Sequence, residues 1–297
     1  MTWRVSPSGE LCTGAVLISF APIFVRAMDT SPTTAAFYRC ALGGALLLSL
    51  ARWRAPGSIT RSAAARNWSI LAGLFFALDL AAWHRSIHLI GPGLATLLVN
   101  LQVFVLAGYG HFFLKQRLAP RQGAGMGMAI AGLTLLLVPG DHAAHAEDQT
   151  GVWLALATAF VYSGYILSLR RARAVGESPL AEVGVASISA AAFLLPLVLL
   201  WNEELVVANR NEGLLVLGYA VLPQVLGWVL ISRGQARLSP STVGLLLLLQ
   251  PTLAFAWDVW LFSRTTTVQE WCGVSLALVG VGLGSSGVRQ SSPRTHP

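Results

Sequence analysis

Ten stretches of mostly apolar residues follow one another through this chain, with short polar segments between them. A helix needs about 20 such residues to cross the hydrocarbon core of a bilayer. Only 11% of the residues are charged, against about 25% in soluble domains. We therefore predict an all-α integral membrane protein with ten transmembrane helices, at residues 10–28, 32–52, 67–89, 91–113, 120–138, 151–170, 179–201, 213–233, 239–262 and 268–287.

Basic residues gather in alternate connecting segments, such as 52–66, 115–121 and 170–173. Because cytoplasmic loops of membrane proteins are enriched in Arg and Lys, this pattern places both termini in the cytoplasm. The net charge of +7 is then an orientation signal, and we expect no nucleic-acid partner. No cleavage site for a signal peptide follows the first span. We predict a multi-pass protein of the bacterial inner membrane.

The chain repeats itself at a shift of 148 residues. Pairs of like residues align without a gap, namely Arg85 with Arg233, Pro92 with Pro240, Gln102 with Gln250, Tyr109 with Trp257, Gly125 with Gly273, and Gly132 with Gly280. Each half would hold five helices, and because five is odd the second half enters the membrane inverted. Inverted repeats are typical of secondary transporters, which bind substrate near the midplane between the repeats.

Three stretches, AAFYRCALGGALLL at 35–48, GLATLLVNLQVFVLAGYG at 93–110 and STVGLLLLLQPTLAFAWDVW at 241–260, resemble the EamA domains of the drug/metabolite transporter superfamily. The resemblance covers nearly the whole chain. It implies one repeat at 1–140, a second at 151–288 and a cytoplasmic tail at 289–297. It also implies a central cavity lined by helices one, three, four, six, eight and nine, and transport of amino acids or other small metabolites, often outward.

Several polar and aromatic residues share one depth. Gln102 and Gln250 lie ten residues after Pro92 and Pro240, which is about 15 Å along a helix and half of a core about 30 Å thick. Gln224 reaches the same depth. Aromatic residues share helix faces with these polar groups. We predict a substrate site of Gln102, Gln250, Gln224, Trp228, Trp83, Tyr162, Tyr165 and Arg39.

Charged residues inside spans are costly and mark functional sites or buried pairs. Arg39 and Asp79 match in depth, so two interpretations stay open. They form a structural ion pair, or they face the cavity, where Arg39 binds a substrate carboxylate and Asp79 carries a proton. His84 is a second candidate for proton coupling, or it lies at the outer interface.

Six further residues carry weaker expectations. Asn100 is two positions before Gln102, so on a regular helix it faces the opposite way and bonds a neighbouring helix. Asp258, near the outer end of the ninth span, is either a gate or solvated. The pairs Gly123/Gly127 and Gly280/Gly284 are suited to close helix packing.

We therefore expect an exporter of a small polar metabolite, with an amino acid or a related amphiphile as substrate, that works by alternating access. An importer or exchanger of phosphorylated or nucleotide-linked metabolites is the alternative, followed by a non-transporting membrane sensor.

The spans hold no set of residues that favours an enzyme. Cys12, Cys40 and Cys272 have no spacing typical of zinc or redox sites, so we expect no metal and no cofactor. The oligomeric state stays open.

Overall fold

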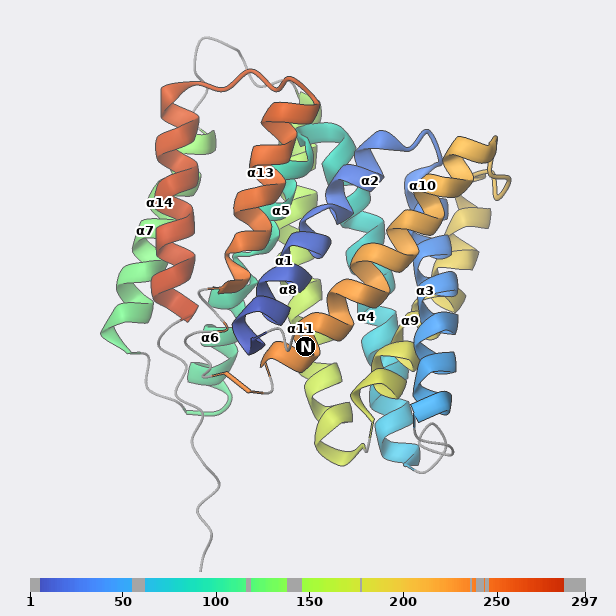
Figure 1. Ribbon diagram of the computed structural model, residues 1–297. Coiled ribbons are helices and arrows are strands. Elements are labelled where there is room, and N and C mark those ends of the chain that lie inside the picture. Colours follow the sequence, from blue (N-terminus) through green and yellow to red (C-terminus); the bar gives the residue numbers. More distant parts are fainter. Residues whose placement is uncertain are drawn as a thin grey trace, which may run out of the picture.

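The structure is a computed structural model, which describes residues 6–54, 62–115, 119–137, 146–176, 178–235, 237, 238, 243 and 246–285. Across these ranges the chain is helical and contains no strand (Figure 1). Seven segments are long and apolar enough to cross a membrane, and Val268–Leu283 is a shorter apolar helix. The prediction of an all-α, multi-pass membrane protein is confirmed. Pro240 and the tail at 289–297 lie outside the described residues.

The helices of the first half are α1 (Pro7–Ser19), α2 (Ala21–Ala27), α3 (Pro32–Arg54), α4 (Ala63–Ile90), α5 (Pro92–Val99), α6 (Gln102–Phe112) and α7 (Pro120–Leu137). Those of the second half are α8 (Ala146–Val175), α9 (Pro179–Leu200), α10 (Arg210–Val221), the π-helix η1 (Leu222–Gly227), α11 (Trp228–Gln235), α13 (Leu249–Leu261) and α14 (Val268–Ser285). Five of them begin at a proline, whose missing N–H costs nothing at that position.

Three spans predicted as continuous helices are interrupted in their middle, the first of them at Phe20, between α1 and α2. The Asn100 side-chain amide donates to the Thr96 carbonyl oxygen at 2.8 Å. Just after it, three backbone N–H groups donate to the carbonyl oxygen three residues earlier rather than four, namely those of Leu101, Val103 and Phe104. A side chain that competes for a backbone acceptor in this way weakens an α-helix. In the eighth span Pro223 lacks an N–H, and the backbone widens into η1 around it.

The helices pack in pairs that join the two halves of the chain. In Figure 1, α7 and α14 lie side by side at one edge of the bundle, and α3 and α9 lie at the opposite edge. Between these edges α4 packs on α8. The largest apolar cluster among the described residues is built from α3, α4, α8, α9, η1 and α11, with Leu80 and Leu194 almost fully buried within it.

Glycines allow α7 and α14 to approach closely. A Cβ atom at Gly132 would lie 2.6 Å from the backbone of Ala277, and one at Gly280 would lie 2.5 Å from the backbone of Ala129. Gly123 and Gly127 have open space instead. Of the predicted close-packing glycines, Gly280 therefore lies in a helix contact, whereas Gly123 and Gly127 do not. Gly284 is outside the residues whose side-chain surroundings are described.

Substitution of Gly280 by alanine is expected to destabilise the protein, because the new methyl group meets backbone that cannot move aside. Overpacking of this kind costs about 1–3 kcal/mol. Gly127→Ala is the matched control, and it should be neutral or slightly stabilising because alanine favours a helix over glycine by about 0.5–1 kcal/mol. Thermal unfolding of the purified protein in detergent measures both. Equal midpoints for the two variants would contradict the close contact.

Candidate functional site

A cavity of about 860 Å³ lies in the centre of the bundle. Its walls come from α1, α2, α3, α4, α5, α6, α8 and α11, and from the segment that includes Val243 and Gln250. Ligand pockets for small molecules usually have volumes of about 300–1,000 Å³ and mix apolar walls with a few polar groups. The lining includes eight residues predicted from the sequence: Arg39, Asp79, Trp83, Gln102, Tyr162, Tyr165, Trp228 and Gln250.

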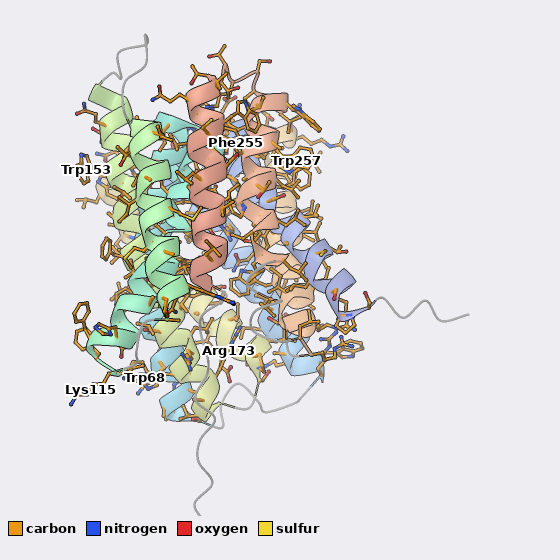
Figure 2. All side chains as sticks on the ribbon, turned by 90° about the vertical axis from the view of Figure 1, so that its left-hand side faces the viewer. Trp68, Lys115, Trp153, Arg173, Phe255 and Trp257 are labelled. Atoms are coloured by element: carbon orange, nitrogen blue, oxygen red, sulfur yellow. The ribbon has the colours of Figure 1, made fainter. Side chains whose placement is uncertain are left out.

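The lining runs from the middle of the bundle to one end. Arg170 and Arg173, near the end of α8, and Leu238 contribute at this end. Figure 2 shows Arg173 and Trp68 there, at the bottom, and Phe255 and Trp257 at the top. We call these the lower and upper ends of the bundle. The orientation predicted from the basic residues makes the lower end cytoplasmic.

One wall of the cavity is aromatic. Tyr165 stacks on Phe76 with ring centroids 4.8 Å apart and on Tyr162 at 5.5 Å, and the Trp228 ring meets it edge-on at 6.4 Å. The four rings come from α4, α8 and the start of α11. Such a wall can bind the apolar part of a ligand, and its ring faces also attract cations.

Arg39 is held at the cavity by partners from the second half of the chain. Its Nε donates to Gln224 Oε1 at 2.7 Å, and its Nη1 donates to the Tyr219 hydroxyl at 2.7 Å. The guanidinium also lies over the Tyr219 ring, 4.8 Å from the centroid. Buried charges need such partners because leaving one unpaired costs several kcal/mol. Nη2 donates no hydrogen bond to any described residue.

Gln224 supports Arg39 and does not line the cavity. It is fully buried, and its amide donates to Ser187 Oγ at 2.9 Å. A Cβ atom at Gly43 would lie 2.5 Å from its side chain, which leaves Gln224 no room to reach a ligand. The three glutamines predicted to converge therefore separate into two that line the cavity, Gln102 and Gln250, and one that orients Arg39.

His84 is also absent from the cavity lining. Its Nδ1 lies 2.7 Å from the Pro32 carbonyl oxygen and its Nε2 lies 2.8 Å from the Tyr219 hydroxyl. A carbonyl only accepts, so Nδ1 carries the proton, and Nε2 can accept from Tyr219 while that hydroxyl accepts from Arg39. This network satisfies a neutral imidazole and places His84 in the interior rather than at the outer interface.

Asp79 lies at the cavity without a partner. It is 4% exposed, and it forms neither a hydrogen bond nor an ion pair with any residue that the structure describes. The expected ion pair with Arg39 is therefore not formed, although the two charges interact electrostatically. Trp83, one turn further along α4, also lines the cavity, and its Nε1 has no partner.

Several lining residues were not predicted from the sequence. Asn100 faces the same cavity as Gln102, because the helix break between them removes the rotation of a regular helix. Arg173 was detectable, since it lies eleven residues after Tyr162 and thus on the same helix face. Its Nε and Nη2 are buried without partners. Thr96 Oγ1 and Gln102 Oε1 are likewise unpartnered.

The upper end of the bundle is closed by buried polar contacts. The Asp258 carboxylate is 3% exposed, accepts from the Gly93 N–H at 3.0 Å and lies 3.4 Å from Arg264. Arg264 also donates to the Ile90 carbonyl oxygen and to Glu270. Because α5 has no side-chain cap of its own, Asp258 serves as its cap from α13. The burial of Asp258 excludes the solvated alternative.

A second contact at the upper end joins α3 and α4 to the segment that follows α9. Glu203 pairs with Arg85 at 2.8 Å and accepts from the backbone N–H groups of Thr33 and Thr34 at 2.9 Å. At the lower end Glu10 pairs with Arg233 and Arg237, both about half exposed. Exposed pairs contribute less than about 1 kcal/mol, so the buried contacts at the upper end are the stronger of the two sets.

The fold and the cavity together define a membrane transport protein. The EamA-like transporter family matches residues 11–138 and 149–285, so the chain belongs to this family. A solved crystal structure aligns with this chain at a TM-score of 0.65 and 21% sequence identity. The alignment covers 93% of this chain and 95% of the chain in that structure. At that identity the likeness establishes the fold alone.

Two relatives carry names that describe export. A probable terminal-alkyne amino-acid exporter of Streptantibioticus cattleyicolor is 30% identical over 206 residues, which are 68% of this chain and 65% of that protein. A probable amino-acid metabolite efflux pump of Salmonella typhimurium is 27% identical over 205 residues, which are 66% of this chain and 68% of that protein. The match to the first relative thus spans slightly less than two thirds of its length.

Removal of the Tyr219 hydroxyl is expected to destabilise the protein, because it leaves Arg39 Nη1 and His84 Nε2 unpaired. An unsatisfied buried group costs about 1–3 kcal/mol, more when it is charged. Tyr219→Phe should therefore lower the midpoint of thermal unfolding in detergent. The matched control is Tyr109→Phe, whose hydroxyl bonds no described residue. A Tyr219→Phe variant as stable as the control would contradict the network.

Proposed function

We propose that this protein is a secondary transporter of the bacterial inner membrane that exports amino acids or related small amphiphiles by alternating access, with both termini in the cytoplasm. The observation that carries the proposal is the central cavity, which combines Arg39, Asp79 and two glutamines with an aromatic wall. The names of the two relatives agree with this substrate class.

Alternating access would arise from two inverted repeats of five helices, at 1–140 and 151–288. The contacts between α7 and α14 support this arrangement, because they are reciprocal. Gly132 packs against the backbone of Gly273 and Ala277, and Gly280 packs against the backbone of Gly125 and Ala129. A shift of 148 residues converts one set into the other. The family match, which falls on 11–138 and on 149–285, divides the chain at the same place.

The structure is consistent with a state that is closed at the upper end and faces the cytoplasm. The polar lock at the upper end consists of Asp258, Arg264 and Gly93. At the same shift these positions correspond to Gly110, Gln116 and Ser241, so the lower end would close without a carboxylate. We infer that the lock biases the empty carrier toward the inward-facing state. Asp79, the unpaired carboxylate in the cavity, is our candidate for proton coupling.

The transport activity is tested with purified protein in liposomes that are loaded with labelled amino acids. We expect selective efflux, and we expect Gln102→Ala and Gln250→Ala each to reduce it by roughly 10-fold, as the loss of a hydrogen bond to a charged ligand does. Gln149→Ala, at an exposed position on α8, is the control. Efflux of no amino acid would contradict the proposed substrate class.

An importer or exchanger of phosphorylated or nucleotide-linked metabolites is the second candidate, and one observation favours it. Arg170 and Arg173 line the cavity in addition to Arg39, and arginine clusters suit phosphate. The two added residues lie near the lower end of α8. Uptake of a labelled sugar phosphate or nucleotide into the same liposomes, with no amino-acid efflux, would support this candidate over the first.

Asp258→Asn is expected to weaken the lock at the upper end, since it removes the charge that Arg264 and the α5 N-terminus share. Spin labels at the exposed positions Val206 and Val268 report the width of this end by double electron–electron resonance. The variant should populate a longer distance than the native protein. Glu204→Gln, an exposed change at the same end, is the control. Identical distance distributions in all three proteins would exclude a role for Asp258 in gating.

A further inference from the structure

Asp79 is a buried carboxylate that forms no hydrogen bond or ion pair with any residue the structure describes. It is 4% exposed and lines the cavity. An isolated buried carboxylate is strongly disfavoured unless it is paired. Natural proteins keep such groups where a ligand or a proton supplies the missing interaction. The partner of Asp79 is therefore to be sought among the molecules that enter the cavity.

Arg39, the cation that interacts electrostatically with Asp79, already donates hydrogen bonds to other groups. Arg39 directs Nε and Nη1 to Gln224 and Tyr219, and these bonds hold the guanidinium away from Asp79. Its Nη2 remains without a bond among the described residues. The cavity thus presents the carboxylate of Asp79 together with guanidinium nitrogens that bond no described residue, namely Arg39 Nη2 and, nearer the lower end, Arg173 Nε and Nη2. Asp79 and Arg39 interact electrostatically but form no ion pair. Two charged groups held apart in this way suit a ligand that carries both opposite charges.

The surroundings of Asp79 favour an organic ammonium group over a metal ion. The described part of the chain holds no group of three metal-ligating side chains, and hard cations need several oxygen ligands. Aromatic rings lie beside Asp79 instead. Phe76 is one turn before it and Trp83 one turn after it on α4, and Tyr162 lines the same cavity. Ring faces attract ammonium groups.

We propose that Asp79 binds the ammonium group of the substrate while Arg39 Nη2 binds its carboxylate, so that the site selects free α-amino acids with apolar or aromatic side chains. The proposal rests on the proposed export of amino acids and adds the residues that recognise each end. Charged hydrogen bonds of about 2.8 Å at each end require Asp79 and Arg39 to stand apart, as they do. The wall of Phe76, Tyr165 and Trp228 then contacts the side chain.

Ligand derivatives test this assignment on the native protein. Binding of labelled phenylalanine and leucine is measured in detergent, in competition with their N-acetyl derivatives, which lack the ammonium charge, and their amides, which lack the carboxylate. A site that bonds both ends rejects a ligand that lacks one of them, and we expect each derivative to bind at least about 10-fold more weakly. Derivatives that bind as well as the free amino acids would overturn the proposal.

A protein variant tests the role of Asp79 separately. Asp79→Asn should weaken phenylalanine binding by roughly 10- to 100-fold but leave the affinity for N-acetylphenylalanine unchanged, because that ligand has no ammonium group to lose. Asp29→Asn, at an exposed position outside the cavity, is the control. Equal loss of affinity for phenylalanine and for N-acetylphenylalanine in Asp79→Asn would contradict the assignment. If Asp79→Asn does not fold, the binding of the derivatives to the native protein still tests whether the site recognises the ammonium group and the carboxylate.

The outcomes distinguish this proposal from the proposed function. Liposomes that export phenylalanine and N-acetylphenylalanine at equal rates would leave amino-acid export standing and overturn the assignment of Asp79. Liposomes that export no amino acid at all would contradict both the proposed export of amino acids and the assignment of Asp79. Export of the free amino acids alone, combined with loss of export in Asp79→Asn, would support both.

Discussion

The structure depends on how one guanidinium is kept charged inside the membrane. Arg39 lies on α3, in the first half of the chain, but its partners Gln224 and Tyr219 lie on the eighth span, in the second half. A buried charge without partners would cost several kcal/mol, so folding must bring the two halves together at this point. The network continues through Tyr219 to His84 and Pro32, and so joins α3 and α4 to the eighth span.

The same network determines what remains free for a ligand. Because Gln224 and Tyr219 satisfy Arg39, the guanidinium does not collapse onto Asp79, and both residues stay at the cavity surface. The lock at the upper end acts in a comparable way, since Asp258 both caps α5 and holds α5 against α13. Buried polar groups in this protein therefore serve two purposes: they join helices, and they keep selected charges available.

The sequence predicts the membrane class and part of the cavity lining, because hydrophobic length and shared depth follow from helix geometry alone. Eight of the lining residues were found in this way. Gln224 and His84 were misplaced because depth does not reveal whether a helix face meets the cavity or a neighbouring helix. Asn100 was misplaced because its side chain breaks the regular helix on which the prediction relied. The cap that Asp258 provides for α5 joins residues 165 positions apart, and no local pattern reveals it.

We propose that the substrate binds in the cavity between Arg39, Asp79 and the aromatic wall. Electron cryomicroscopy of the purified protein in nanodiscs, with and without saturating phenylalanine, tests it most directly. We predict added density in contact with Asp79 and Arg39, with the Arg39 bonds to Gln224 and Tyr219 kept. Density elsewhere in the bundle, or an empty cavity in which Arg39 pairs with Asp79, would contradict the account.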